Sequence, residues 1–301
     1  MTDYELHEDP QLEAPAVVVM LTGWIDAGGA AQMAMASLDE EWGGRTIATF
    51  DGDSFIDYRA RRPVMELRDG VNTNLIWPSI ELKAARDGAG RDVLLLTGHE
   101  PDSAWQRFVD VATELCIGFG PRLMVGLGAY PFAVPHTRPS RLSVSCGSPE
   151  VAAGLSYLKN TVDVPAGVQA ALEHAFTVKG IAAVGLWAQV PHYVSASAYP
   201  PASVALLDGL AEVGGLRSEA AVLREEALRH RGRLDELIAA NAEHLAVLHQ
   251  LEEAYDADVP LDPYGPVPGG RGGASPLTAG DLPSGDELAA ELERFLREQG
   301  G

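Results

Sequence analysis

The sequence predicts an α/β protein with a mixed, mostly parallel sheet, helices on both faces of that sheet, and a C-terminal helical arm. Continuous apolar runs of strand length alternate with longer segments of helical periodicity, which is the pattern of strands covered on both faces. A hairpin signal adds antiparallel strands, so we expect a mixed sheet. The chain has 301 residues, 46% of them apolar, which is enough to bury a sizeable core.

The expected elements follow one another in chain order. The first apolar run, residues 16–21, predicts a buried strand, and residues 28–42 predict the helix that follows it. Residues 63–77 alternate around Asp69-Gly70, a dipeptide that predicts a tight hairpin turn. A helix is predicted over residues 102–117, with Trp105 on its inward face. Further strands are expected at residues 46–50, 93–97, 123–127 and 181–190.

Changes in composition divide the chain into four segments. Ser218 is a candidate N-cap for the helical arm, and Gly232 is a candidate break between two helices within it. Between Pro260 and Gly285, 13 of 26 residues are Gly or Pro, which is linker composition. The segments are an α/β core (1–215), a helical hairpin or arm packed on it (216–258), a Gly/Pro-rich linker (259–285) and a short amphipathic helix (286–301).

The charge balance narrows the classes of partner. Acidic residues number 43 and basic residues 22, giving a formal net charge of −21. Such a surface repels phosphodiester backbones and anionic lipid, so we expect neither a nucleic-acid nor a membrane partner. Two cysteines are too few for a disulfide framework, and no zinc-site spacing or nucleotide-binding fingerprint occurs. The expectation is a cytoplasmic protein with no metal and no cofactor.

The segment from Gly128 to Pro139 is the first of three candidate ligand or interface loops. Its three prolines stiffen a loop expected to leave a buried strand. Arg138 could hold a carboxylate or phosphate, and His136 could act as acid, base or metal ligand. Alternatively, Arg138 pairs with Glu100 or Asp102 and locks neighbouring loops together. The candidates from this loop are Tyr130, His136, Thr137 and Arg138.

The other two candidate loops also lie between a strand and a helix. Asp26 stands among glycines, either beside an anion site at the helix N-terminus or in a tight turn where it satisfies backbone donors. His99, Glu100 and Asp102 could supply an acid/base pair if burial separates the pKa values of the carboxyl groups. Alternatively, Asp102 or Ser103 caps the following helix and Glu100 complements its dipole.

These three segments, with Gly185-Leu-Trp-Ala-Gln-Val-Pro-His-Tyr193 and Ser197-Ala-Tyr-Pro-Pro-Ala-Ser203, resemble the proteasome assembly chaperone 2 family in its bacterial branch. The resemblance covers roughly residues 5 to 255. It implies a phosphorylase/hydrolase-like fold that is often a homotrimer, and most bacterial members have no assigned reaction.

Two functions are therefore expected, and the sequence assigns no catalytic residue to either. The first is a non-enzymatic oligomeric assembly or scaffold protein with a protein partner, the proteasome link coming from the resemblance alone. The alternative is a hydrolase/phosphorylase-like enzyme or metabolite binder that uses the strand-end crevice. The alternative requires the candidate side chains to converge around a cavity.

Overall fold

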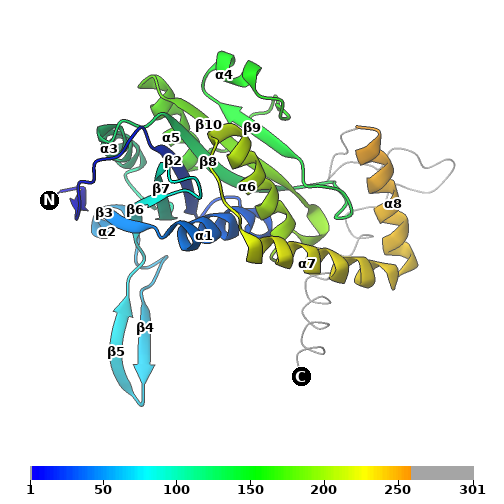
Figure 1. The fold of residues 1–301 in the computed structure, drawn as a ribbon. Helices are drawn as coiled ribbons and strands as arrows, with labels where there is room; N and C mark the ends of the chain where they lie inside the picture. The colour runs from blue at the N-terminus through cyan, green and yellow to red at the C-terminus, as the bar shows by residue number, and fades with distance from the viewer. Residues whose placement is uncertain (1, 259–301) are drawn as a thin grey trace.

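An eight-stranded sheet organises residues 2–258, the part of the chain that the computed structural model describes (Figure 1). The strand order is β1-β3-β6-β7-β2-β8-β10-β9. The central strands β7, β2, β8 and β10 run parallel, and the pairs on either side of them are antiparallel. The mixed sheet is confirmed, but parallel pairing is confined to its centre. The strands are β1 (Tyr4–Leu6), β2 (Ala16–Thr22), β3 (Arg45–Phe50), β6 (Ile80–Arg86), β7 (Asp92–His99), β8 (Leu123–Phe132), β9 (Leu142–Cys146) and β10 (Ala182–Pro191).

Burial on both faces explains why the apolar run of β2 shows no alternation. Val17 and Val19 face one core, Val18 and Met20 face the other, and none of the four is more than 4% exposed. Burying such a side chain contributes about 1.5–3 kcal/mol relative to leaving it in water. The central strands therefore hold the two apolar layers together.

All five apolar runs predicted to be strands are strands.

Two helices cover each face of the sheet. Helices α1 and α6 pack over the core that contains Val18, and α3 and α5 over the core that contains Val17. The helix predicted from residue 28 begins at Ala30, and the helix predicted from residue 102 begins at Trp105. The helices of this layer structure are α1 (Ala30–Trp42), α2 (Gly52–Phe55), α3 (Trp105–Gly118), α4 (Pro149–Gly154), α5 (Val168–Val178) and α6 (Pro200–Gly214), with short 3₁₀ turns at Ala27–Gly29 and His192–Val194.

The predicted hairpin forms as β4 (Val64–Arg68) and β5 (Val71–Ile76). Its two turn residues both have positive φ, 49° at Asp69 and 80° at Gly70, as a tight two-residue turn requires. The two strands pair only with each other, as a separate two-stranded sheet. They project away from the body of the protein (Figure 1).

The arm consists of α7 (Ala221–Ala239) and α8 (Ala242–Asp256), and two local predictions about it are wrong. Gly232 lies inside α7, and the break falls at Asn241, whose side chain accepts a hydrogen bond from Glu243 N–H and caps α8. Ser218 does not cap α7, which begins three residues later. Its hydroxyl instead donates to Glu41 at the end of α1.

The predicted linker (259–285) and terminal helix (286–301) lie outside the described residues. Within residues 2–258, none of the helices combines the length and the apolar character that crossing a bilayer requires.

Candidate functional site

The three candidate loops leave the sheet at adjacent strand ends. Strand β2 lies between β7 and β8 and runs parallel to both, with Thr22 paired to His99. Beyond β2, Asp26 forms an isolated bridge with Ala129 of β8. Parallel pairing thus places the starts of all three loops at one edge of the sheet, where open α/β sheets bind ligands.

Asp26 serves the start of α1. Its carboxylate accepts hydrogen bonds from the backbone N–H groups of Ala31 at 2.8 Å and Gln32 at 3.0 Å. Burial raises the pKa of Asp26, although these hydrogen bonds oppose the change. The preceding turn uses Gly28 and Gly29 at φ values of 63° and 57°. Because Asp26 already occupies these amides, the tight-turn interpretation describes the loop, and an anion has no free amides of Ala31 and Gln32 to bind.

The end of β7 and the loop after it bind three different segments of the chain. His99 Nδ1 lies 2.9 Å from the Thr22 hydroxyl, and Asp102 Oδ2 accepts from Arg61 Nε at 3.1 Å. Glu100 is buried and accepts a hydrogen bond from Val168 N–H, the first residue of α5. Burial raises the pKa of Glu100 and lowers that of His99. The two carboxylates therefore bind separate partners instead of forming an acid/base pair.

Three local predictions for this loop are corrected. Neither Asp102 nor Ser103 caps α3, since the N-cap position is Ala104 and no side chain caps it. The Ser103 hydroxyl instead donates to the carbonyl of Ser54, and Glu100 lies at the start of α5. Trp105 is 37% exposed and its indole N–H donates to a backbone carbonyl, so it is not a core residue.

Tyr130 belongs to β8 and not to a loop. Pairing with β10 continues to Phe132 opposite Pro191, five residues beyond the predicted strand end. The Tyr130 hydroxyl lies 3.2 Å from the Ser143 hydroxyl and accepts from the Gln189 amide at 3.0 Å. Tyr130 thus joins three neighbouring strands.

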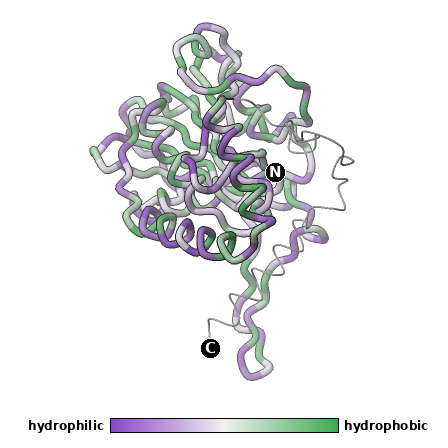
Figure 2. The backbone as a smooth tube through the Cα atoms, turned by 90° about the vertical axis from the view of Figure 1, so that its right-hand side faces the viewer, coloured by the Kyte–Doolittle hydropathy of each residue, from purple (hydrophilic) through white to green (hydrophobic). Residues whose placement is uncertain are grey.

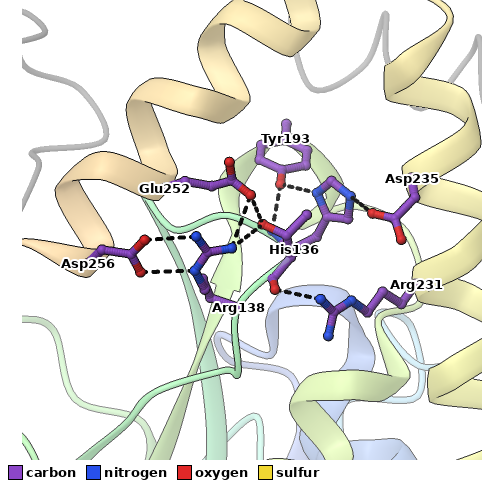
Figure 3. Close-up of polar contacts among 8 residues, drawn as sticks. His136, Arg138, Tyr193, Arg231, Asp235, Glu252 and Asp256 are labelled. Carbon is purple, nitrogen blue, oxygen red and sulfur yellow. Dashed lines mark hydrogen bonds and ion pairs between the residues drawn. The ribbon is translucent and has the colours of Figure 1, made fainter.

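His136 is the centre of a polar cluster between the loop after β8 and the arm (Figure 3). Its side chain is fully buried, with Nε2 3.1 Å from Asp235 Oδ1 on α7. Its Nδ1 lies 2.7 Å from the Tyr193 hydroxyl, which also accepts from His136 N–H at 2.8 Å. A carboxylate only accepts hydrogen bonds, so Nε2 carries the proton and Tyr193 donates to Nδ1. Burial lowers the pKa of His136 although Asp235 opposes this, and the ring is neutral.

The next two residues of the loop bind α8 (Figure 3). Arg138 donates through Nε and Nη2 to both carboxylate oxygens of Asp256, at 2.9 and 2.7 Å, and through Nη1 to Glu252 at 3.1 Å. Thr137 donates its hydroxyl to Glu252, and its carbonyl accepts from Arg231 of α7 at 2.6 Å. The loop is therefore fastened to both helices of the arm by charge-assisted hydrogen bonds.

The candidate residues thus belong to four separate sets of contacts, made by Asp26, by the His99 loop, by Tyr130 and by the His136 loop. Arg138 does not pair with Glu100 or Asp102, so that predicted contact is wrong, while its structural role is realised with other carboxylates. Within residues 2–258, no group of three or more His, Cys, Asp or Glu side chains is arranged to hold a metal ion. The partners that sequence reasoning missed are Arg61, Tyr193, Arg231, Asp235, Glu252 and Asp256.

The fold and the cluster define an α/β protein whose strand-end loop is clasped by an appended pair of helices. Residues 20–238 match the PAC2 family, and the chain belongs to that family. No curated protein matches it.

Solved structures extend this result. A protein of unknown function from Corynebacterium glutamicum is 32% identical, with a TM-score of 0.79 over 85% of this chain and 97% of that one. A Mycobacterium tuberculosis protein of unknown function is 36% identical, with a TM-score of 0.77 over 85% of this chain and 89% of that one. A proteasome-assembly chaperone homologue from Mycobacterium tuberculosis is 33% identical, with a TM-score of 0.71 over 77% of this chain and 99% of that one.

Proposed function

We propose that this chain is a non-enzymatic assembly or scaffold protein that works as a homo-oligomer, with a role like that of the proteasome-assembly chaperones. The observation that carries the proposal is the projecting hairpin. Most of its large apolar side chains face solvent: Val64 (62% exposed), Met65 (51%), Leu67 (52%), Val71 (61%), Leu75 (44%), Ile76 (50%) and, just beyond it, Trp77 (52%). Figure 2 shows hydrophobic stretches along this projection.

The exposed residues lie on both faces of the hairpin. Val64 pairs with Ile76 on one face, and Met65 pairs with Leu75 on the other. An isolated two-stranded hairpin is at best marginally stable in water, and the body of the protein covers neither face. A partner that encloses the hairpin from both sides would remove this apolar surface from water.

A second copy of this chain is the partner that we propose. With a net charge of −21, two copies repel each other over most of their surfaces, so their contact must be apolar and weakly charged. The strands and turn of the hairpin, residues 64–76, carry only Glu66, Arg68 and Asp69, a net charge of −1. A trimer, as implied by the family resemblance, is the proposed assembly, in the cytoplasm, where Cys116 and Cys146 remain the free thiols that they are in this structure.

The separation of the candidate residues into different sets of contacts argues against the enzyme alternative. That alternative required Asp26, the His99 loop and the His136 loop to converge, yet their side chains are occupied with different structural partners. A phosphorylase/hydrolase-like reaction would need a free acid, base or nucleophile among them. The proteasome is the proposed client through family membership.

Native mass spectrometry of the full-length protein tests the oligomer. A trimer has a mass near three times 31.9 kDa. Replacing Met65, Leu67 and Leu75 with Ser should produce monomers, because the apolar contact is lost. The matched control replaces Val222 and Leu228 on α7, which are 77% and 74% exposed, and should leave the trimer intact. A wild-type monomer, or a trimer that survives the hairpin substitutions, contradicts the proposal.

The assembly role requires a second measurement. The wild-type protein, mixed with proteasome α-subunits of its own cell, should form a complex of defined mass. If no such complex forms while the homo-oligomer is intact, the proteasome part of the proposal is wrong, and the protein is a scaffold for a different partner.

A further inference from the structure

A cavity of about 500 Å³ lies between α1 and the base of the hairpin, away from the arm and its polar cluster. The ends of β2 and β7 form its floor, and Thr22 and His99 line the cavity there. Its walls are residues of α1, β6 and the segment that leads out of the hairpin. The volume falls within the range of about 300–1,000 Å³ for small-molecule sites.

The charged side chains of the cavity leave an excess of one positive charge. Lys83 lies 2.7 Å from Asp39, which also lines the cavity, and 3.9 Å from Glu81, which does not, so Lys83 is already paired with carboxylates. Arg62 lines the cavity from an exposed position and has no ion-pair or hydrogen-bond partner within residues 2–258. A guanidinium presents a planar fork that matches a carboxylate. One unpaired arginine beside a lysine that is already paired with carboxylates favours a monoanion over a dianion.

The rest of the lining is neutral or apolar. Burial and the neighbouring Arg61 lower the pKa of His99, so its ring is neutral and hydrogen-bonds Thr22. Met20 and Met35 form an apolar wall, and methionine adapts to irregular ligands. Trp77 completes the wall, with its ring edge-on to Tyr58 at a centroid distance of 4.8 Å.

We propose that this cavity binds a small organic monoanion, a carboxylic acid with an apolar or aromatic body. Arg62 receives the carboxylate at the opening, and Met20, Met35 and Trp77 hold the apolar body. The neutral groups of Thr22 and His99 accommodate a polar substituent at the floor. The site uses neither the arm nor the outer part of the hairpin, but it shares Val64, Ile76 and Trp77 at the base of the hairpin with the proposed oligomer surface.

Ligand-observed fluorine NMR on the full-length oligomer tests the proposal. The probes are 4-fluorophenylacetate and its neutral analogue, 4-fluorophenylacetamide. The acid should bind with a Kd of about 1 mM or tighter, the range expected for a probe of this size. The amide should bind at least about tenfold more weakly, because it cannot form the charge-assisted contact with Arg62.

Two substitutions locate the site. Arg62→Gln should raise the Kd of the acid by about tenfold and leave the Kd of the amide unchanged. Arg59→Gln, at an exposed arginine three residues away that does not line the cavity, should change neither. Ala36→Trp places a large ring in the cavity from an exposed position on α1 and should abolish binding of both probes. Circular dichroism of each variant checks that it is folded.

The proposal is overturned if the acid does not bind at millimolar concentration, or if acid and amide bind equally. It is also overturned if a folded Arg62→Gln variant binds the acid as the wild type does.

Discussion

The buried imidazole of His136 donates its Nε2–H to the carboxylate of Asp235 at 3.1 Å and so joins the loop after β8 to α7. The contact pairs a fully buried ring with a half-exposed carboxylate. Because the imidazole is neutral, it behaves as a fixed hydrogen-bond donor and not as a free acid or base. The loop that most invited a catalytic interpretation is the attachment point of the arm.

Acid should loosen the arm. Burial lowers the pKa of His136, and burial with Arg233 nearby lowers that of His230 on α7 to about 4. Both pKa values lie below the usual value of about 6.5. As the pH falls, the two rings therefore bind protons more readily when the arm is released than when it is docked, and acid favours release. The stability from the neutral rings is complete above about pH 6.5 and is lost as the pH falls toward their folded pKa values. Hydrogen exchange of α7 should therefore accelerate between pH 7 and pH 5, after correction for the intrinsic rate.

His230→Phe should reduce this acid sensitivity because it removes one of the two titrating rings. His249→Phe, at an exposed position on α8, should leave it unchanged. If acid accelerates exchange equally in the wild type and in His230→Phe, protonation of His230 is not a cause of the acid sensitivity.

Arg138→Gln should release α8 without unfolding the sheet. The substitution removes contacts with both Glu252 and Asp256. We expect faster hydrogen exchange over residues 242–256, with β2 and β7 unchanged. Arg229→Gln is the control and should leave α8 protected, because the only ion pair of Arg229 within residues 2–258 is a 3.9 Å contact with Glu225 on the exposed side of α7. Protected α8 in Arg138→Gln would show that the remaining contacts, such as that of Arg141 with the carbonyl of Tyr255, are enough to hold the helix.

Two neighbouring glycines should respond differently to alanine. Both Gly28 and Gly29 have left-handed backbone, so alanine should cost about 1–2 kcal/mol at Gly29, where nothing lies within 4 Å of the added Cβ. At Gly28 the new Cβ would lie 2.7 Å from the Cβ of Tyr199, which adds about 1–3 kcal/mol of overpacking. Urea unfolding of both variants gives the difference. Equal losses would mean that the Tyr199 segment yields freely.

Phe108→Ala should destabilise the α3 side of the sheet. The ring is fully buried and packs against Phe50 and Phe55 at centroid distances of 5.0 and 5.3 Å. Truncation should lower the free energy of unfolding by about 3–5 kcal/mol in urea titrations. Val222→Ala, at a position 77% exposed, should change it by less than about 0.5 kcal/mol. A loss below 1 kcal/mol at Phe108 would mean that the core closes over the gap.

The sequence predicted the sheet better than the site, and for a physical reason. Apolar runs such as residues 16–21 are dictated by burial on both faces, which local composition records. Local composition does not record the partners of Arg138. Glu252 and Asp256 lie 114 and 118 residues after Arg138 and look like ordinary solvated acids. Strand β6 was missed because its apolar Ile80 and Leu82 alternate with Glu81 and Lys83, whereas the predicted sheet strands were identified as continuous apolar runs.

The end of β8 shows the same limit. Pro131 suggested that the strand stops, yet β10 pairs with β8 as far as Phe132, a contact between segments far apart in sequence. Similarly, Asn241 and not Gly232 divides the arm, since one glycine costs a helix only about 1 kcal/mol.

The distance in sequence between the loop after β8 and α8, which binds it, has a consequence for synthesis on the ribosome. Arg138 emerges long before Glu252, 114 residues later, so the growing chain must carry this cationic loop unmatched while the sheet is assembled. Domains generally fold from their N-terminal side as they are made. Attachment of α8 is therefore among the last events of maturation, and a chain truncated before Glu252 would keep its sheet while leaving the guanidinium facing water.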